Sequence, residues 1–185
     1  MKKYNAILAM NRKNVIGRNN SIPWYLPEDL NYFRRVTQNQ IVIMGRKTYE
    51  SLPLSPLPKR INIVLTSSPE KYDYLQNLHA DKLFFVKYEH LDMLMNELKE
   101  ELRTKEVFVM GGSEIYELFY PLYKTVHLTI VEDISEEDND IYSPFTEELL
   151  LEDGFIEKHR ESDKKSVENA QIFQHIIFEN DKVAL

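Results

Sequence analysis

Short apolar segments recur along the chain, and polar stretches separate them. The segments are rich in Val, Ile, Phe and Tyr, a composition that favours β-strands. The predicted strands cover residues 6–10, 40–44, 61–66, 83–87, 106–110, 125–131, 155–159 and 172–178.

Between several of these strands, apolar residues recur at helical spacing. The clearest helical pattern covers residues 90–102. Its apolar residues fall along one face: Leu91, Leu94, Met95, Leu98 and Leu102. Another helix is expected to begin at Pro27. Proline is favoured at the first helical position, because the N–H that it lacks would have no hydrogen-bond partner within the helix there. Shorter helices are expected after Gly45 and Gly112.

Strands that alternate with helices predict an α/β fold with a largely parallel central sheet. Only a polar stretch, residues 161–169, separates the last two predicted strands, so they are expected to form an antiparallel hairpin at the sheet edge. The chain has no repeat and no low-complexity linker, and we expect one domain over residues 1–185.

Composition narrows the class of protein. The 185 residues are 43% hydrophobic and 29% charged, which is typical of a soluble globular protein. No apolar run approaches the roughly 20 residues that span a bilayer, and the early run at 6–10 is short for a secretory signal. The absence of cysteine excludes disulfides and thiolate metal sites. We expect a cytoplasmic protein without a membrane partner.

The net charge of −7 argues against nucleic acid as the main partner, because binding its backbone needs clustered Lys and Arg. The five histidines are scattered without ligand-type spacing, so no catalytic metal is expected. The acidic stretch 132–140 lacks the residue spacing of a calcium loop.

The segment 19–30 holds the single Trp of the chain, Trp24, two prolines and a carboxylate, Asp29. Asp29 precedes Leu30 and therefore lies at the edge of the helix's apolar stripe. A carboxylate there is a candidate anchor for a ligand with adjacent N–H donors. The alternative is that Asp29 only opposes the positive end of the helix dipole.

Three predicted strand ends have the residues of a phosphate-binding turn: 44–48, 65–68 and 109–114. In 44–48 and 109–114, glycine permits a close approach of backbone N–H groups, and a following helix presents more of them. The segment 65–68 is instead a cluster of hydroxyl side chains. Each turn alone is also compatible with a purely structural role. The Gly-x-Gly-x-x-Gly fingerprint is absent.

Taken together, these residues resemble the dihydrofolate reductase family. The resemblance runs from about residue 6 to residue 178 and rests on four motifs in order, which include 22–30, 43–51, 57–62 and 110–116. It implies a central, mostly parallel eight-stranded sheet with an antiparallel C-terminal edge strand, flanked by about four helices. It also implies hydride transfer from NADPH to the pterin ring of 7,8-dihydrofolate, which gives 5,6,7,8-tetrahydrofolate.

The resemblance assigns roles to individual residues. Asp29 orients the pterin and favours protonation at N5, Trp24 holds a water and the loop over the nicotinamide, and Thr129 hydrogen-bonds Asp29. The implied substrate-binding residues are Ile7, Asp29, Leu30, Phe33, Leu57, Arg60, Met110 and Thr129. The implied cofactor-binding residues are Ala9, Ile16, Gly17, Gly45, Arg46, Lys47, Thr48, Thr66, Ser67, Lys87, Met110, Gly111, Gly112, Ser113 and Tyr116.

The chain departs from the family pattern in a few places. Tyr49 stands where Trp is common, Ile22 replaces a usual Leu or Met, and the segment around Asp140 matches only loosely, so Asp140 is given no role. Asp29, where animal enzymes carry Glu, suggests the bacterial type, and a monomer is expected. The alternatives are a related pterin or pyrimidine reductase, a non-catalytic nucleotide-binding protein and a pure interaction domain.

Overall fold

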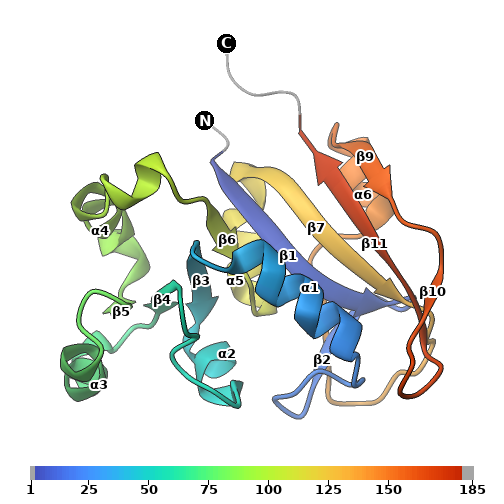
Figure 1. Ribbon diagram of the computed structural model, residues 1–185, viewed down its shortest axis with the longest axis horizontal. Coiled ribbons are helices and arrows are strands. Elements are labelled where there is room, and N and C mark those ends of the chain that lie inside the picture. Colours follow the sequence, from blue (N-terminus) through green and yellow to red (C-terminus); the bar gives the residue numbers. More distant parts are fainter. Residues whose placement is uncertain (1–2, 181–185) are drawn as a thin grey trace.

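The computed structural model describes residues 3–180, and its main feature is one large twisted sheet with helices on both faces (Figure 1). Eight strands follow each other in the order β10-β11-β7-β1-β6-β3-β4-β5, and β9 also pairs with β11. The strands are β1 (Tyr4–Asn11), β3 (Ile41–Gly45), β4 (Ile61–Leu65), β5 (Leu83–Val86), β6 (Val107–Val109), β7 (Tyr123–Val131), β9 (Ile156–Arg160), β10 (Lys164–Lys165) and β11 (Ile172–Glu179).

The six strands from β5 to β7 run parallel, whereas β9, β10 and β11 are antiparallel additions at one edge. All eight predicted strands belong to this sheet, and the antiparallel arrangement of the last two is confirmed by the β9–β11 pairing. The sequence did not predict β10, a pair of exposed lysines. It also did not predict a separate two-stranded sheet of β2 (Val15–Arg18) and β8 (Asp140–Tyr142), whose strands are too short to show an alternating pattern.

Residues 3–180 contain six α-helices, where about four were expected. They are α1 (Pro27–Thr37), α2 (Arg46–Ser51), α3 (Asp73–Leu78), α4 (Leu91–Glu97), α5 (Ser113–Phe119) and α6 (Glu147–Glu152). The additional two, α3 and α6, span fewer than two turns, so an apolar repeat has no length over which to recur. Short 3-10 turns are η1 (Pro69–Tyr72), η2 (Tyr88–His90), η3 (Glu101–Arg103) and η4 (Tyr120–Leu122).

The helix predicted over residues 90–102 is shorter in the structure. Regular α-helix ends at Glu97, and a turn followed by η3 leads the chain towards β6. The apolar face is as predicted, because Leu98 and Leu102 still pack against the core although they lie beyond the helix. Burial of these side chains therefore continues after the backbone has left the α-helical path.

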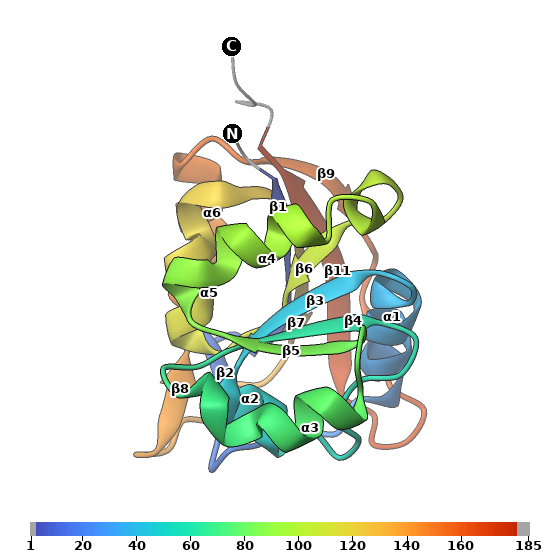
Figure 2. The ribbon, with the colours of Figure 1, turned by 90° about the vertical axis from the view of Figure 1, so that its left-hand side faces the viewer.

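The sheet separates two hydrophobic cores, because side chains of a strand alternate between its faces. Ile41 and Ile43 of β3 pack with α4, α5 and α6, whereas Val42 and Met44 pack with α1, α2 and α3. Figure 2 shows α1 on the opposite side of the sheet from α5 and α6. The carboxyl ends of the parallel strands, where open α/β sheets bind ligands, point towards the loop that carries β2 (Figure 1).

Candidate active site

Asp29 lies in the first turn of α1 and reaches the sheet beneath the helix. Pro27 stands at the start of α1, as predicted, and the backbone N–H of Asp29 bonds to the carbonyl of Leu26. The Thr129 hydroxyl donates a hydrogen bond of 2.6 Å to Oδ1 of Asp29. Among the described residues, every hydrogen bond to this carboxylate reaches Oδ1, which leaves Oδ2 for a ligand.

The position of Thr129 follows from strand register. On β7 it lies opposite Ala9 of β1 and His175 of β11, and two residues earlier His127 lies opposite Ile7. Side chains at paired positions point to the same face of a sheet, and so do residues two apart. These five residues therefore form a floor beneath α1.

Two histidines on this floor were not predicted as site residues. Nε2 of His175 lies 3.3 Å from Oδ1 of Asp29, and Nδ1 lies 2.8 Å from Oε2 of Glu161. The His175 ring stacks on Tyr32 with centroids 4.0 Å apart, and the Tyr32 hydroxyl lies 2.8 Å from Nδ1 of His127. The spacing 127, 129 on one strand could have placed His127 beside Thr129, but nothing local links residue 175 to Asp29.

Burial sets the protonation of this network. Desolvation, with the nearby charge of Glu161, raises the pKa of Tyr32 to about 12. Desolvation, with the nearby His175, lowers the pKa of His127 to about 4. His127 is therefore neutral at physiological pH, and Tyr32 keeps its proton.

A buried cation lies at the far end of α1. Arg60 is 8% exposed, and its guanidinium donates to Thr37 Oγ1 (2.9 Å), the Pro58 carbonyl (2.7 Å) and the Arg34 carbonyl (3.2 Å). Desolvation and the charge of Arg34 lower the pKa of Arg60. No carboxylate of residues 3–180 forms an ion pair with it, and guanidinium has five N–H donors. Two donors are therefore free for an anion.

Phe33 stands close to this cation, and Leu57 lies in the same hydrophobic cluster as Phe33. The Phe33 ring centroid is 5.6 Å from the Arg60 guanidinium carbon, and both apolar side chains pack on the α1 side of the sheet. Asn62 holds the Leu57 backbone by a bond in each direction, with the Leu57 N–H at 2.9 Å and its carbonyl at 3.0 Å. Leu30, also predicted as a substrate contact, is 40% exposed on α1.

The loop before α1 packs on the other end of the floor. Trp24 is partly buried against Leu26, Val131 and Phe173. This small cluster fixes the Trp-bearing loop to β7 and β11, the two strands that also supply Thr129 and His175.

The two glycine turns predicted to bind phosphate lie together. Gly45 at the end of β3 donates an N–H bond of 2.8 Å to the carbonyl of Gly111, and a Cβ placed on Gly112 would lie 3.5 Å from Thr48 Oγ1. The Gly111–Gly112 peptide is cis, and Gly111 has φ +112°. A Cβ on Gly111 would lie 3.2 Å from the Tyr116 ring. This close approach of backbone leaves room for a ligand only because the turns lack side chains.

Tyr116 and Met110 connect this turn to the sheet. The Tyr116 hydroxyl donates 2.8 Å to the carbonyl of Ile7, and burial raises the pKa of Tyr116. The Ile7 carbonyl, predicted to face the pterin, therefore already accepts one hydrogen bond and has one lone pair left. The backbone N–H of Met110 donates to Ile43, so its carbonyl is the group available at this position.

Most of the other predicted cofactor residues lie at or just after the ends of β3, β4 and β5, which are neighbours in the sheet. The Arg46 guanidinium pairs with Glu50 at 2.7 Å, and both side chains are exposed, so its contact with the cofactor stays a prediction. Thr66 accepts a bond from the N–H of Ser68, and Ser67 is exposed. Lys47 and Lys87 form no ion pair with any residue of the described range.

Ile16 and Gly17 lie on β2, which pairs with β8. The structure gives Asp140 on β8 a role that the sequence did not predict. Asp140 on β8 accepts two bonds from Arg18, at 2.5 Å from Nε and 3.0 Å from Nη2. The Ser113 hydroxyl at the start of α5 donates 2.7 Å to the carbonyl of Tyr142. The small β2–β8 sheet is thus attached to the end of the glycine turn.

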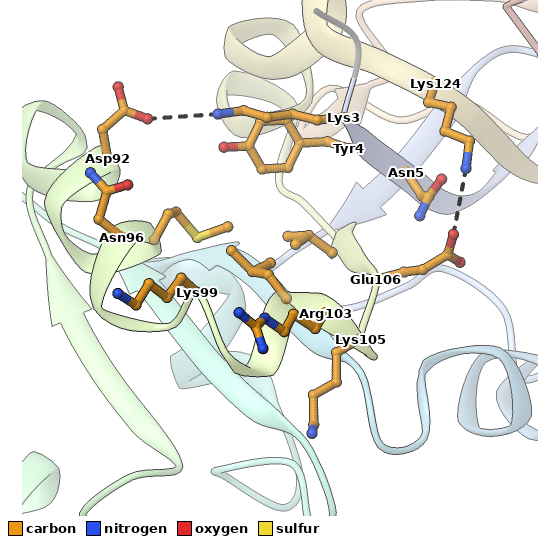
Figure 3. A pocket seen from close by; sticks show the side chains of 13 residues that line it. Lys3, Tyr4, Asn5, Asp92, Asn96, Lys99, Arg103, Lys105, Glu106 and Lys124 are labelled. Atoms are coloured by element: carbon orange, nitrogen blue, oxygen red, sulfur yellow. Dashed lines mark ion pairs between the residues drawn. The ribbon is translucent and has the colours of Figure 1, made fainter.

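A hollow lies away from these residues, at the amino ends of β1 and β6 (Figure 3). Its lining includes five basic residues, and four of them form ion pairs: Lys3 with Asp92, Arg103 with Glu100, Lys105 with Glu101 and Lys124 with Glu106. None of the predicted site residues lines it. Within residues 3–180, no His, Asp or Glu cluster is arranged to hold a metal ion, and no helix has the length and apolarity to cross a membrane.

Comparison with known proteins gives a consistent result. A family model described as dihydrofolate reductase matches residues 3–180. The chain is 35% identical to dihydrofolate reductase of Bacillus subtilis (strain 168) over 132 residues, 71% of each protein. It is 33% identical to that of Haemophilus influenzae over 165 residues, 88% of this chain and 91% of the relative.

A solved structure shows the same fold. Dihydrofolate reductase from Enterococcus faecalis, complexed with NADP(H) and RAB-propyl, matches with a TM-score of 0.73 and 24% identity over 97% of both chains. The floor beneath α1, the paired glycine turns and the sheet order thus occur in a chain whose sequence matches one family along nearly its whole length. The chain belongs to the dihydrofolate reductase family.

Proposed function

We propose that this protein reduces 7,8-dihydrofolate to 5,6,7,8-tetrahydrofolate with NADPH, and that Asp29 is the carboxylate that binds the pterin. The observation that carries the proposal is the state of this carboxylate. Oδ1 is fixed by Thr129, and Oδ2 is left for a ligand. The pterin edge presents a 2-amino group and N3 side by side, and a carboxylate can accept from both.

Asp29 has two tasks in this proposal. It orients the ring, because its helix and the Thr129 bond fix the carboxylate against the sheet. It also favours protonation at N5, which the reduction requires, through a water held near Trp24. Ile7 and Met110 offer backbone carbonyls to the same ring.

Arg60 binds the α-carboxylate of the substrate's glutamate. A buried guanidinium without an acidic partner is costly unless a ligand supplies the negative charge. Its planar donors match a carboxylate in two parallel bonds. Phe33 packs beside it, and Phe33 and Leu57 belong to the cluster that offers the pterin and benzoyl rings apolar contact.

The cofactor is NADPH, which supplies the hydride when bound. The residues fit it, because the turns at Gly45 and Gly111–Gly112 lie in contact and have no side chain between them. These turns and Tyr116 receive the pyrophosphate and nicotinamide, and Thr48, Thr66, Ser67, Lys47 and Lys87 receive the adenosine phosphate. The Enterococcus faecalis relative was solved with NADP(H), which supports this assignment. A cytoplasmic location and a monomeric state stay predictions.

The site favours this reaction over the alternatives that the sequence leaves open. A related reductase on the same fold needs neither Asp29 nor Arg60 in these positions, and a purely nucleotide-binding protein needs only the glycine turns. The apolar side chains that the structure exposes are scattered over several elements, so they give no support to a pure interaction domain.

The test follows NADPH absorbance after addition of dihydrofolate to the purified protein. Steady oxidation that depends on dihydrofolate is the expected result. Oxidation without dihydrofolate, or none while NADPH still binds, contradicts the proposal and points to another substrate or to a binding protein. Asp29→Asn in the same assay separates the reaction from the role given to this residue.

A further inference from the structure

The ring of His175 lies between two carboxylates. Nε2 is 3.3 Å from Oδ1 of Asp29, Nδ1 is 2.8 Å from Oε2 of Glu161, and the imidazole side chain is only 5% exposed. A neutral imidazole carries a single N–H, so it can donate to one carboxylate and must present a lone pair to the other. Both contacts are favourable only if the three groups hold one additional proton. Either the ring is an imidazolium or one carboxyl group is protonated.

The environment of Glu161 decides which groups share this proton. Burial disfavours the ionised form of Glu161 and so raises its pKa. Hydrogen bonds from Lys164 and His175 outweigh this effect, and the pKa of Glu161 lies below its ordinary value. Lys164 lies 2.6 Å from Oε2 and is 47% exposed. Glu161 is therefore ionised and accepts the N–H of Nδ1. The additional proton then lies between Nε2 of His175 and Oδ1 of Asp29.

The other groups around the ring leave this assignment unchanged. On α1, Tyr32 stacks on the imidazole and keeps its proton, and Arg35 lies over the Tyr32 ring at 5.4 Å. On β7, Thr129 donates to the same Oδ1, and His127 is neutral because burial lowers its pKa to about 4. Phe173 on β11 packs edge-on against the His175 ring.

We infer that His175, oriented by Glu161, is a positioning residue that shares one proton with Asp29 and so keeps a proton beside the bound pterin. The inference rests on the proposed role of Asp29. When the pair gives up this proton, it becomes a neutral imidazole and a carboxylate, and it regains the proton from solvent. The catalytic residue remains Asp29, since His175 acts through it.

The kinetic test compares the pH dependence of hydride transfer in the native protein and in His175→Phe, which keeps a ring on Tyr32 but has no nitrogen. Without the imidazole, the proton beside Asp29 is lost at lower pH, so the rate should fall about tenfold more at pH 8 than at pH 6. His159→Phe is the matched control, because His159 is an exposed histidine on the neighbouring strand β9. Equal pH profiles for native protein and His175→Phe overturn the inference.

A second variant separates orientation from the proton. The Gln side chain of His175→Gln can donate an N–H to Asp29 but cannot hold an additional proton. We expect a KM for dihydrofolate within about threefold of the native value, together with the shifted pH profile of His175→Phe. A native pH profile in His175→Gln overturns the shared proton.

A measurement that needs no turnover keeps this inference distinct from the proposed function. Nitrogen-15 NMR of histidine-labelled protein reports the protonation of each ring nitrogen. We expect Nδ1 of His175 to carry its proton throughout, and the titration of Nε2 to move in Asp29→Asn. A ring whose nitrogen signals are unchanged by Asp29→Asn overturns the inference. If the ring responds but dihydrofolate is not reduced, the proposed function fails and the shared proton stands.

Discussion

The hydroxyl of Thr129 donates a 2.6 Å hydrogen bond to Oδ1 of Asp29 across 100 positions of sequence. It joins the carboxyl end of β7 to the first turn of α1, and it fixes one oxygen of the carboxylate while the other stays available. Glu28, the preceding residue in the same turn, is used differently. It accepts bonds from Ser166 Oγ (3.0 Å) and the Val167 N–H (2.9 Å), and so holds the hairpin before β11.

Asp29→Asn should fold and still lose on the order of 10²–10⁴ in turnover, the scale for removal of an acid–base group. The amide keeps the size of the side chain but carries no charge and cannot take up a proton. Steady-state NADPH oxidation gives the rate, and circular dichroism reports folding. Glu28→Gln is the matched control, and its turnover should stay within about threefold of the native value. Near-native turnover in Asp29→Asn would remove this residue from the reaction.

Arg60→Lys should weaken dihydrofolate binding by roughly 1.5–3 kcal/mol, the scale of a hydrogen bond to a charged group. Lysine keeps the positive charge but loses the planar pair of donors that matches a carboxylate. Binding is measured by calorimetry or fluorescence quenching. NADPH affinity is the internal control and should be unchanged, because Arg60 lies at the far end of α1 from the glycine turns. Equal losses for both ligands would indicate a general disturbance of the fold.

Gly111→Ala should destabilise the protein by roughly 1–3 kcal/mol, the usual cost of a residue held in a sparsely populated backbone region. Gly111 has φ +112°, and an added Cβ would lie 3.2 Å from the Tyr116 ring. Urea unfolding measures the change. Gly17→Ala is the comparison, since its Cβ would meet nothing closer than 3.6 Å. Similar losses in both variants would argue against the special position of Gly111.

Acid should destabilise the fold through His127. The unfolded imidazole binds a proton near its ordinary pKa of 6.5, whereas burial lowers the pKa of His127 to about 4 in the folded protein. The unfolded state therefore binds more protons between these values, and the stability present above pH 6.5 is lost as the pH falls towards 4. The stability lost between pH 7 and pH 5 is about 2 kcal/mol.

The measurement for His127 is the free energy of unfolding in urea at pH 7 and pH 5. His127→Gln keeps a polar partner for Tyr32 and cannot take up a proton, so its stability should fall less over this interval. Parallel curves for the two proteins would show that another group accounts for the acid sensitivity.

Residues with local patterns were predictable, and residues that depend on strand pairing were not. Pro27 and the apolar spacing after it gave the start of α1 correctly, and the strands that lead to Gly45 and Gly111 were placed within a residue or two. His175 escaped prediction because only the antiparallel register of β11 on β7 sets it opposite Thr129. Arg46 was predicted as a phosphate ligand from its position after a strand, and its exposed ion pair with Glu50 one turn later could not be foreseen from that position.

The family resemblance added what periodicity could not, namely the joint position of Asp29 and Thr129. Asp140 shows the opposite case, because its segment matched the family pattern only loosely and received no role. In the structure it holds β2 through Arg18. A weak motif match at one position therefore did not mean a weak contact.

The sheet order has a consequence for the nascent chain. Most of the residues assigned to the nucleotide lie on or beside β3, β4, β5 and β6, which adjoin each other in the sheet and end before Tyr116. The partners of Asp29 come from β7 and β11, and β11 is the last strand described. A ribosome must therefore release residue 175 before the pterin pocket can close, while the nucleotide side can assemble earlier. Contacts this distant in sequence form slowly, so recovery of folate binding on refolding should lag behind recovery of NADPH binding.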